Sequence, residues 1–359
     1  MTLHSLSGLG LPRHLALMGG LAVFSAMIVR IMIAIRVPDF PDPRKAHNVT
    51  TPKSGGVGIV GAFLLGVGLL YRYGHVSRLA DPYFIGVISA AVLIALVSLL
   101  DDIRNMSYTV KLGGQLLAAV VAVASGLWVH NFTLPYFGEI DVGWWGLPLN
   151  IFFLMFITNA MNFIDGLNGL AAGVTLIACL FLAIIGGPLG EFFIYTASLL
   201  LAGGVLGFLP FNFPKGRIFM GDVGSQFCGF MLALFGIAAA RFEQIQMSFL
   251  LVPFLLSGVL YDVTFTLIRR SLLRENIARA HNGHLYQLAS RAGMSRTKIA
   301  LIHWLFAVIG GISAIIFISI NSEARIWIVL PPIAIQVAWT IYVFHRAHKA
   351  GLAPWLRAA

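Results

Sequence analysis

Charge is scarce in this chain, and that scarcity excludes an ordinary soluble protein. Only 11% of its 359 residues are charged and 58% are hydrophobic, whereas a typical soluble domain has roughly 25% charged residues. There are only two cysteines, Cys179 and Cys228, both within apolar stretches, so no disulfide framework is expected. Acidic residues are also few, with 14 Asp and Glu against 24 Lys and Arg. The resulting net charge of +10 is high enough for a nucleic-acid-binding protein, but the positions of the charges indicate a membrane.

Long apolar runs occupy most of the chain. A helix needs roughly 20 apolar residues to cross the hydrocarbon core of a bilayer. We therefore expect an all-α polytopic membrane protein with about eleven transmembrane helices, forming a single integral-membrane domain over residues 1–359. The first run contains Arg30 and is too long for a signal-peptide core, so we expect it to be retained. The predicted spans cover residues 14–36, 55–71, 83–100, 112–128, 147–164, 167–186, 190–209, 224–240, 247–268, 299–318 and 325–344.

The basic residues predict the orientation of these spans. Eighteen Lys and Arg residues lie in the connections after odd-numbered spans and in the C-terminal tail, and five lie on the opposite side. Cytoplasmic loops carry an excess of Lys and Arg. The N-terminus is therefore predicted to lie outside and the C-terminus in the cytoplasm.

Four aspartates stand at the predicted cytoplasmic ends of spans. They are Asp101, Asp102, Asp165 and Asp222. Carboxylates at such positions are costly to bury and usually mark an ion, proton or substrate site. This concentration, in a chain with so few acids, predicts a functional site on the cytoplasmic face.

Asp101 and Asp102 directly follow the apolar run VISAAVLIALVSLL. Adjacent residues on a helix point about 100° apart, so the two carboxylates are expected to face different groups, one a cation and the other a nucleophile. Lys111 begins the next span and suits the neutralisation of phosphate. The alternative is an ordinary polar helix end with mixed charge.

The segment NAMNFIDGLNG has a polar residue at every third position. Gly166 and Gly169 are expected to break the helix there. Amide and carboxylate oxygens on a broken helix near the membrane surface suit a hard cation or a polar ligand. The alternative is hydrogen bonding between helices. The polar residues are Asn159, Asn162, Asp165 and Asn168.

Two further connections contain candidate residues. In FNFPKGRIFMGDVGSQ, Asn212 and Lys215 precede Asp222, which we expect either to bind a ligand or to act only as the N-cap of the next span. The first connection is rich in proline and contains His47. It ends in SGGVG, whose small residues predict a close approach between helices.

Residues 269–298 form the longest and most basic connection. Leu273, Ile277 and Ala280 recur at helical spacing, which predicts an interfacial helix. His281 and His284 follow, but no further Cys or His would complete a zinc site, so they suit anionic phosphate better. The alternative is a positively charged loop that attracts anionic lipid. Asp262, inside the ninth span, is expected to be a buried hydrogen-bond or ion-pair partner.

Together these groups favour phosphoryl transfer with Mg²⁺ as the cofactor, a role that Mn²⁺ could also fill. Such a reaction needs a cation on a diphosphate, cationic groups near the developing charge and something that orients the acceptor. In a membrane protein, a lipid acceptor fits. A transporter is the rival class, but transporters favour ionisable groups near the midplane and repeated halves. Here the acids lie at span ends, and we find no internal repeat.

The motifs LLDDI with a following Lys, NAMNFIDGLNGLAAG, FMGDVGS and AHNGHLYQ occur in this order within residues 36–290. In this order they resemble the polyprenyl-phosphate N-acetylhexosamine-1-phosphate transferases. AHNGHLYQ is closer to the O-antigen-initiating branch than to the peptidoglycan enzyme. The resemblance implies transfer of an N-acetylamino-sugar 1-phosphate from a UDP-sugar to undecaprenyl phosphate, with release of UMP. It also implies a bacterial inner membrane and a cytoplasmic active site.

The resemblance also implies residue roles. Asp222 and Asp102 would bind the metal. The family often has an Asp where Asn168 stands here, which puts a charge at that position in doubt. Direct attack by the lipid phosphate is our hypothesis, with covalent catalysis by an aspartate left open, as is a homodimer. The implied catalytic residues are Asp101, Asp102, Lys111, His281 and His284. The resemblance implies that Asn162 and Asp165 line the nucleotide and metal pocket. The full set of candidate substrate-binding residues is His47, Asn159, Asn162, Asp165, Asn212, Lys215 and Arg279.

Overall fold

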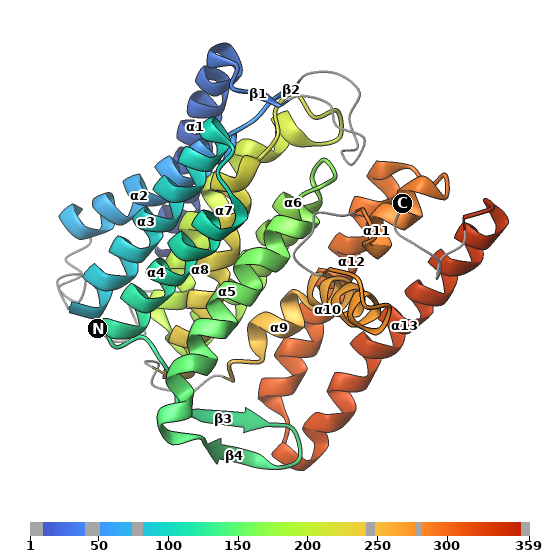
Figure 1. The fold of residues 1–359 in the computed structure, drawn as a ribbon. Coiled ribbons are helices and arrows are strands. Elements are labelled where there is room, and N and C mark those ends of the chain that lie inside the picture. Colours follow the sequence, from blue (N-terminus) through green and yellow to red (C-terminus); the bar gives the residue numbers. More distant parts are fainter. Residues whose placement is uncertain (1–9, 40–50, 74–81, 242–247, 277–281, 353–359) are drawn as a thin grey trace.

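Helices make up nearly all of the regular structure (Figure 1). The structure is a computed structural model that describes residues 10–39, 51–73, 82–241, 248–276 and 282–352. The helices are α1 Gly10–Ile35, α2 Gly56–Tyr73, α3 Pro82–Arg104, α4 Tyr108–Ala124, α5 Gly146–Ile164, α6 Leu170–Leu189, α7 Phe192–Asn212, α8 Gly221–Arg241, α9 Leu251–Leu255, α10 Ser257–Leu272, α11 Leu285–Arg291, α12 Arg296–Ser319 and α13 Arg325–Lys349. Two short hairpins, β1 Pro38–Asp39 with β2 Thr51–Pro52, and β3 Asn131–Leu134 with β4 Gly138–Asp141, are antiparallel.

The all-α polytopic fold is confirmed. Nine of the helices in the described ranges are long and apolar enough to cross a membrane. Each of the eleven predicted spans contains a helix, but α4 has only 17 residues, and the ninth span contains two shorter helices. The number of spans that cross a bilayer, and their orientation, stay predictions.

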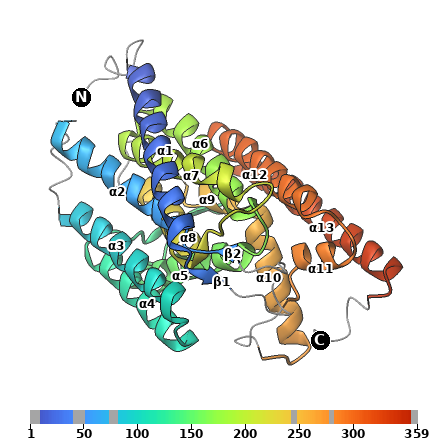
Figure 2. The same ribbon diagram turned by 90° about the horizontal axis from the view of Figure 1, so that it is seen from above.

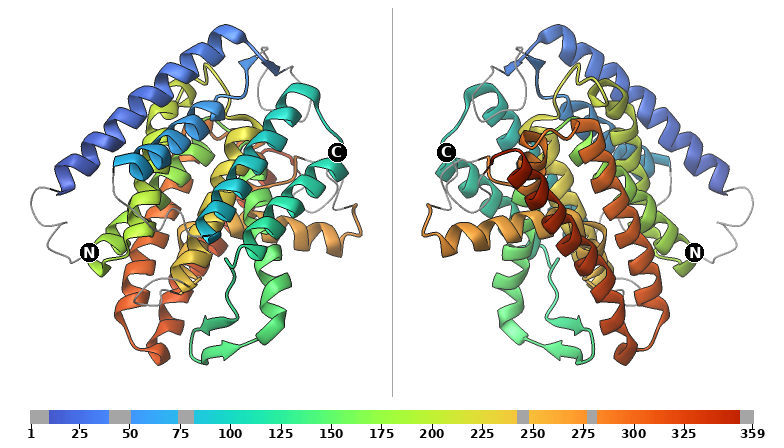
Figure 3. Two further views of the ribbon diagram at one scale, coloured as in Figure 1. Left: turned by 90° about the vertical axis from the view of Figure 1, so that its left-hand side faces the viewer. Right: turned by 90° about the vertical axis from the view of Figure 1, so that its right-hand side faces the viewer.

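The prediction of one continuous helix over the ninth span is wrong. The chain leaves helical geometry at Leu256, with φ −100° and ψ 16°, between α9 and α10. Beyond this break, α10 projects sideways from the bundle (Figure 3). The end of α9 packs directly on α12, where a Cβ on Gly310 would lie 1.9 Å from the Phe254 carbonyl oxygen. This main-chain contact is possible because Gly310 has no side chain.

The interfacial helix predicted to begin near Leu273 does not start there. Helix α10 ends at Leu272, and Arg274 has a positive φ of 55°. Such a conformation is unfavourable for a residue with a side chain inside a helix. Ile277 and Ala280, on which the prediction also rested, lie outside the described residues. Among the described residues between Arg274 and α12, the helix is the short α11 Leu285–Arg291.

Helix α8 runs through the middle of the bundle (Figure 2). Within its apolar window, 94% of the residues are buried. Helices α2, α3 and α5 pack around it. A helix that is apolar on all sides belongs in the interior of a bundle, because every face can be covered by neighbouring helices. The start of α8 carries Asp222, so its position fixes one wall of the site described below.

Helices α2 and α8 touch through their main chains. A Cβ on Gly56 would lie only 2.2 Å from the Cα of Gly224. The segments that precede the two helices are also bonded: Gly55 N donates to Phe219 O at 2.9 Å, and Gly56 N donates to Met220 O at 2.9 Å. The close approach that SGGVG predicts is therefore confirmed.

We predict that Gly56→Ala destabilises the protein, whereas Gly68→Ala on the same helix does not. The added methyl at Gly56 would overlap α8, and overpacking of this kind costs about 1–3 kcal/mol. A Cβ at Gly68 meets nothing within 4 Å, so helix propensity alone would slightly favour alanine. Thermal unfolding in detergent checks this pair of variants. Equal midpoints for the two would contradict the described contact.

Candidate active site

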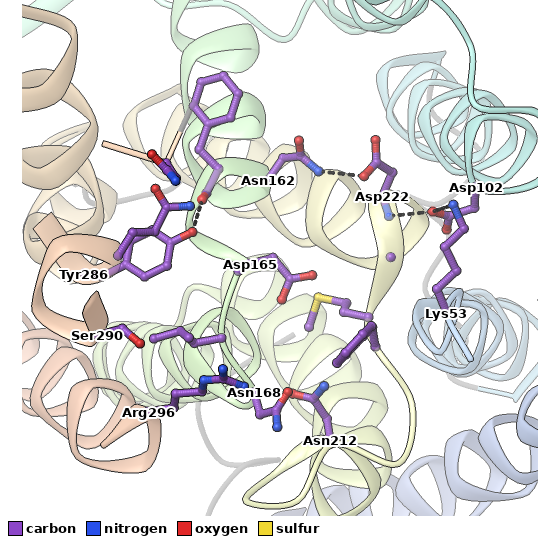
Figure 4. A pocket seen from close by; sticks show the side chains of 18 of the residues that line it. Lys53, Asp102, Asn162, Asp165, Asn168, Asn212, Asp222, Tyr286, Ser290 and Arg296 are labelled. Carbon is purple, nitrogen blue, oxygen red and sulfur yellow. Dashed lines mark hydrogen bonds and ion pairs between the residues drawn. The ribbon is translucent and has the colours of Figure 1, made fainter. Parts of the chain in front are cut away.

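Helix ends from distant parts of the sequence converge on one cavity of about 770 Å³. It is formed by the C-terminus of α3, the N-termini of α4 and α8, the α5–α6 junction and α11 (Figure 4). All four aspartates that the sequence analysis singles out line it. The cavity volume lies within the range of roughly 300–1,000 Å³ that is usual for small-molecule sites. Its lining residues are Lys53, Asp101, Asp102, Asn105, Lys111, Asn162, Phe163, Asp165, Gly166, Leu167, Asn168, Asn212, Phe219, Met220, Gly221, Asp222, Asn282, Tyr286, Gln287, Ser290, Arg291 and Arg296.

Asp222 is surrounded by hydrogen-bond donors. Lys111 Nζ donates to its Oδ2 at 3.1 Å, and Gln226 Nε2 donates to the same oxygen at 3.0 Å. Asn162 Nδ2 donates to Oδ1 at 3.0 Å. Because a lysine and two amides favour the ionised carboxylate, Asp222 is held as an anion in a fixed orientation.

Asp101 shares the lysine with Asp222. Its carboxylate forms an ion pair with Lys111 and accepts a hydrogen bond from the backbone N–H of Met106 at 2.7 Å. One ammonium therefore lies between two carboxylates that would otherwise repel each other. The expectation that Asp101 and Asp102 face different groups is met, since Asp102 contacts α8 rather than α4.

Asp102 caps α8. Its Oδ1 accepts from the Asp222 backbone N–H at 3.0 Å, and its Oδ2 accepts from Val223 N–H at 3.3 Å. Ser54 Oγ also donates to Oδ2 at 3.1 Å, and Lys53 Nζ lies 3.9 Å from Oδ1. The free N–H groups of a helix start favour a carboxylate. The capping role that we considered for Asp222 thus belongs to Asp102, and a metal at Asp102 would compete with these donors.

Gly221 makes this cap possible. It has φ +73°, and a Cβ there would lie 2.4 Å from Oδ2 of Asp102. Both the backbone conformation and the space therefore exclude a larger residue.

A row of buried amides continues from Asp222 into the bundle. A carboxylate only accepts hydrogen bonds, so Gln226 must turn its NH₂ toward Asp222. Its Oε1 then accepts from Gln115 Nε2 at 3.0 Å, and Gln115 Oε1 accepts from Asn159 Nδ2 at 2.6 Å. Asn159, predicted to bind substrate, does not line the cavity; it lies at the far end of this row.

Asp165 differs from the other three aspartates. It is half-buried at the α5–α6 junction, and Figure 4 shows its carboxylate in the middle of the pocket. Among the described residues, no side chain or N–H donates to this carboxylate. Removal from water, together with the nearby carboxylates of Asp222 and Asp102, raises its pKa well above the usual range. An acid in this state favours a cation or a donor group of a ligand.

The side chains of the cavity fit a hard cation that is held partly by a ligand. Within the described ranges, no three His, Cys, Asp or Glu side chains form a group that could hold a metal ion by themselves. Mg²⁺, however, is usually held by one or two carboxylates together with substrate phosphates and water. The unpartnered carboxylate of Asp165, facing the ionised Asp222 across the cavity, is compatible with a cation that arrives with a phosphate ligand.

Helix α11 and the start of α12 form the opposite wall. Tyr286, Ser290 and Arg296 face the pocket from that side (Figure 4), and Gln287 and Arg291 also line it. The cavity therefore combines an acidic region around Asp222 with a region that contains two arginines. Such a combination suits a ligand that carries both phosphate and a bound cation.

His284 does not line the cavity. It is 4% exposed, and its Nδ1 donates to Asp262 Oδ1 at 3.1 Å, since a carboxylate can only accept. The catalytic contact predicted for His284 is therefore not formed here. The expectation for Asp262, a buried hydrogen-bond partner, is confirmed. His47, Arg279 and His281, also predicted to belong to the site, lie outside the described residues.

The connection before α8 supplies one of its two predicted residues. Asn212 lines the pocket, but its side chain is buried and occupied: Oδ1 accepts from Gly169 N–H at 2.6 Å and Nδ2 donates to Ile218 O at 2.9 Å. Lys215 is exposed and does not line the cavity. Asn168, where the family often has an acid, lines the pocket and donates to Pro214 O at 3.3 Å.

Sequence reasoning missed several residues that line the pocket or support Asp222 from behind. Gln115 and Gln226 stand four positions after Lys111 and Asp222, so they lie on the same helical faces, and that spacing could have identified them. Lys53 stands two positions before Gly55, and its contacts with Asp102 and Asn105 show its place in the pocket. Tyr286, Gln287, Ser290 and Arg291 come from α11, a helix that the loop pattern did not predict.

Comparison with known proteins agrees with this geometry. Residues 84–240 match the model of glycosyl transferase family 4. A probable undecaprenyl-phosphate N-acetylglucosaminyl 1-phosphate transferase of Bacillus subtilis is 32% identical over 310 residues, 86% of this chain and 84% of the relative. The decaprenyl-phosphate N-acetylglucosaminephosphotransferase of Mycobacterium tuberculosis is 32% identical over 358 residues, 90% of this chain and 88% of the relative.

A peptidoglycan-type relative matches over a shorter range. The phospho-N-acetylmuramoyl-pentapeptide-transferase of Moorella thermoacetica is 35% identical over 223 residues, 58% of this chain and 66% of the relative. The matched family region contains Asp101, Asp102, Lys111, Asp165 and Asp222, which are the residues that the fold brings into one cavity. By its sequence and by its site, this chain belongs to glycosyl transferase family 4, the polyprenyl-phosphate N-acetylhexosamine-1-phosphate transferases.

Proposed function

We propose that the chain transfers N-acetylglucosamine 1-phosphate from UDP-N-acetylglucosamine to undecaprenyl phosphate and releases UMP. The reaction class, glycosyl-1-phosphate transfer at a membrane, follows from the family. The choice of sugar and lipid is supported by relatives that cover most of the chain and act, by their names, on undecaprenyl or decaprenyl phosphate and N-acetylglucosamine. The product would start a cell-surface polysaccharide, with an O-antigen-like polymer as our prediction.

The observation that carries the proposal is the joint use of Lys111 by Asp101 and Asp222 beside the unpartnered Asp165. This arrangement supports Mg²⁺ dependence, with Asp222 and Asp165 as the residues that would hold the ion. When bound, the ion would neutralise the charge of the donor diphosphate. Lys111 and the arginines of the opposite wall would stabilise the remaining phosphate charge. We place the pocket on the cytoplasmic face of the bacterial inner membrane, where the basic connections predict it.

The contacts of the aspartates favour direct transfer. The lipid phosphate oxygen would attack the β-phosphorus; the bond from that phosphorus to the bridging oxygen would break, and UMP would leave with the bridging oxygen. A covalent route through Asp101 or Asp102 would use one of these carboxylates as the nucleophile. Both are 4% exposed, and each carboxylate already accepts hydrogen bonds or ion pairs. Freeing either would break the α3–α4 or the α3–α8 contact.

The donor test uses purified protein with undecaprenyl phosphate and a panel of UDP-N-acetylglucosamine, UDP-N-acetylgalactosamine and UDP-N-acetylmuramoyl-pentapeptide, following UMP. We expect the fastest release with UDP-N-acetylglucosamine, its loss with EDTA and its recovery with Mg²⁺. Preference for the pentapeptide donor would favour the peptidoglycan-type alternative. Solute flux in proteoliposomes without any UMP release would favour a transporter.

We predict that Asp222→Asn and Asp101→Asn lower turnover by about 100-fold or more, since removal of one electrostatic group from a transition-state site typically costs this much. Asp141→Asn serves as the control, because Asp141 is exposed on the β3–β4 hairpin, at the end of the bundle opposite β1 and β2 (Figure 1). It should keep the wild-type rate. Wild-type-like turnover in both site variants, at equal protein levels, would refute the assignment.

A single-turnover experiment separates direct from covalent transfer. When protein and UDP-N-acetylglucosamine are mixed without lipid, direct transfer predicts no UMP beyond slow hydrolysis, because the attacking group is absent. A covalent intermediate would release up to one UMP per protein in a burst. Rapid-quench measurement of UMP distinguishes the two, and a burst would overturn the direct route.

A further inference from the structure

Asp262 is a buried carboxylate outside the pocket that holds one end of the pocket wall. It lies on α10 and is 1% exposed. Its Oδ1 accepts from Leu285 N–H at 3.0 Å and from His284 Nδ1 at 3.1 Å, and its Oδ2 accepts from Tyr286 N–H at 3.0 Å. Thr266 Oγ1, on α10 itself, is 3.3 Å from Oδ1. Three of these four donors come from the start of α11.

This set of contacts fixes α11 in rotation as well as in place. The first N–H groups of a helix have no partner within the helix, and a buried carboxylate is costly without donors, so each side satisfies the other. Because the two oxygens bind consecutive N–H groups, α11 cannot turn about its axis without losing one of them. These bonds to Asp262 therefore determine which face of α11 lines the pocket.

Tyr286 links the fixed position of α11 to the turn that contains Asp165. The tyrosine is 1% exposed, and its hydroxyl donates to Phe163 O at 2.9 Å. A Cβ on Gly166 would lie 2.2 Å from the same hydroxyl. Phe163 and Gly166 stand on either side of Asp165 in the sequence. The tyrosine therefore braces the turn that presents Asp165 to the pocket.

We propose that Asp262 is a positioning residue of the donor site, acting through α11 and Tyr286 on the turn that carries Asp165. This inference rests on the proposed function, because the pocket is taken to bind the UDP-sugar. In this proposal, His284 helps to hold α11 through its hydrogen bond to Asp262. A purely structural anchor would secure α11 without changing how the donor binds, and the two roles differ in the measured constants.

The test is Asp262→Asn. The amide keeps the size of the side chain, but its NH₂ cannot accept, so one of the two backbone N–H groups of α11 loses its partner. We expect the KM for UDP-N-acetylglucosamine to rise about tenfold, the effect of one lost hydrogen bond to a charged group. The kcat and the KM for undecaprenyl phosphate should stay within about twofold. Hydrogen exchange in residues 285–291 should accelerate.

Two further variants test the separate parts of this proposal. Thr266→Val removes the hydrogen bond to this carboxylate that comes from α10 itself and leaves the three bonds from the start of α11, so both the donor KM and the exchange of α11 should remain as in the wild type. Tyr286→Phe removes the hydroxyl that contacts Phe163 O and Gly166 but leaves the bonds between Asp262 and α11 in place, so the donor KM should rise while exchange in α11 stays slow. In the double variant of Asp262→Asn and Tyr286→Phe, the increase should be less than the product of the two single effects, because both act through one link.

Faster exchange in Asp262→Asn with an unchanged donor KM would make Asp262 an anchor only and overturn the proposal. Multiplicative effects in the double variant would overturn the route through Tyr286. If Asp262→Asn does not accumulate, Tyr286→Phe is sufficient to test the proposal. An unchanged donor KM in that variant would refute it. A wild-type protein that releases no UMP from any UDP-sugar would instead refute the proposed function. In that case, unaccelerated exchange in Asp262→Asn would still overturn the role of Asp262 in holding α11.

Discussion

The site depends on one ammonium group between two carboxylates. Lys111 contacts both Asp101 and Asp222, and without it two anions would face each other at the end of a bilayer span. Coulomb repulsion at such separations in a poorly hydrated site is strong enough to protonate one carboxylate or push the helices apart. With the lysine present, the C-terminus of α3 and the N-termini of α4 and α8 can lie close together. The other features of the pocket, including the cap on α8 and the open position of Asp165, follow from that convergence.

Much of this could be predicted from the sequence, for a clear physical reason. Burying charge in a membrane is costly, so Asp101, Asp102, Asp165 and Asp222 stood out against apolar surroundings, and all four line one cavity. The helices could be predicted equally well, because a helix that crosses the hydrocarbon layer needs a long apolar run. Local patterns also predicted a close approach between helices at SGGVG, although the partner helix, α8, is known only from the structure.

The described candidate residues that do not line the cavity are those whose place depends on three-dimensional contacts. His284 looked like a phosphate ligand because arginines surround it in the sequence, but its nearest anion is Asp262, 22 positions earlier. Lys215 stands between Asn212 and Asp222 along the chain, but the turn before α8 leaves it exposed. Asn159 belongs to a row of amides that points away from the cavity. For His284 and Asn159 the missing information was the partner on another helix, and for Lys215 it was the path of the chain before α8.

The two walls of the pocket are built differently. Where α2 meets α8, Gly55, Gly56, Phe219 and Met220 are joined through main-chain hydrogen bonds, and the glycines leave no side chain between the helices. A junction made by main-chain atoms has no rotamers, so the spacing of α2 and α8 cannot adapt to different ligands. The wall of α11 is lined by side chains, including Gln287, Ser290 and Arg291. Enzymes that share this architecture could therefore change their preference among sugars by exchanging side chains of α11 such as Gln287 and Ser290, and keep the junction of α2 and α8 unaltered.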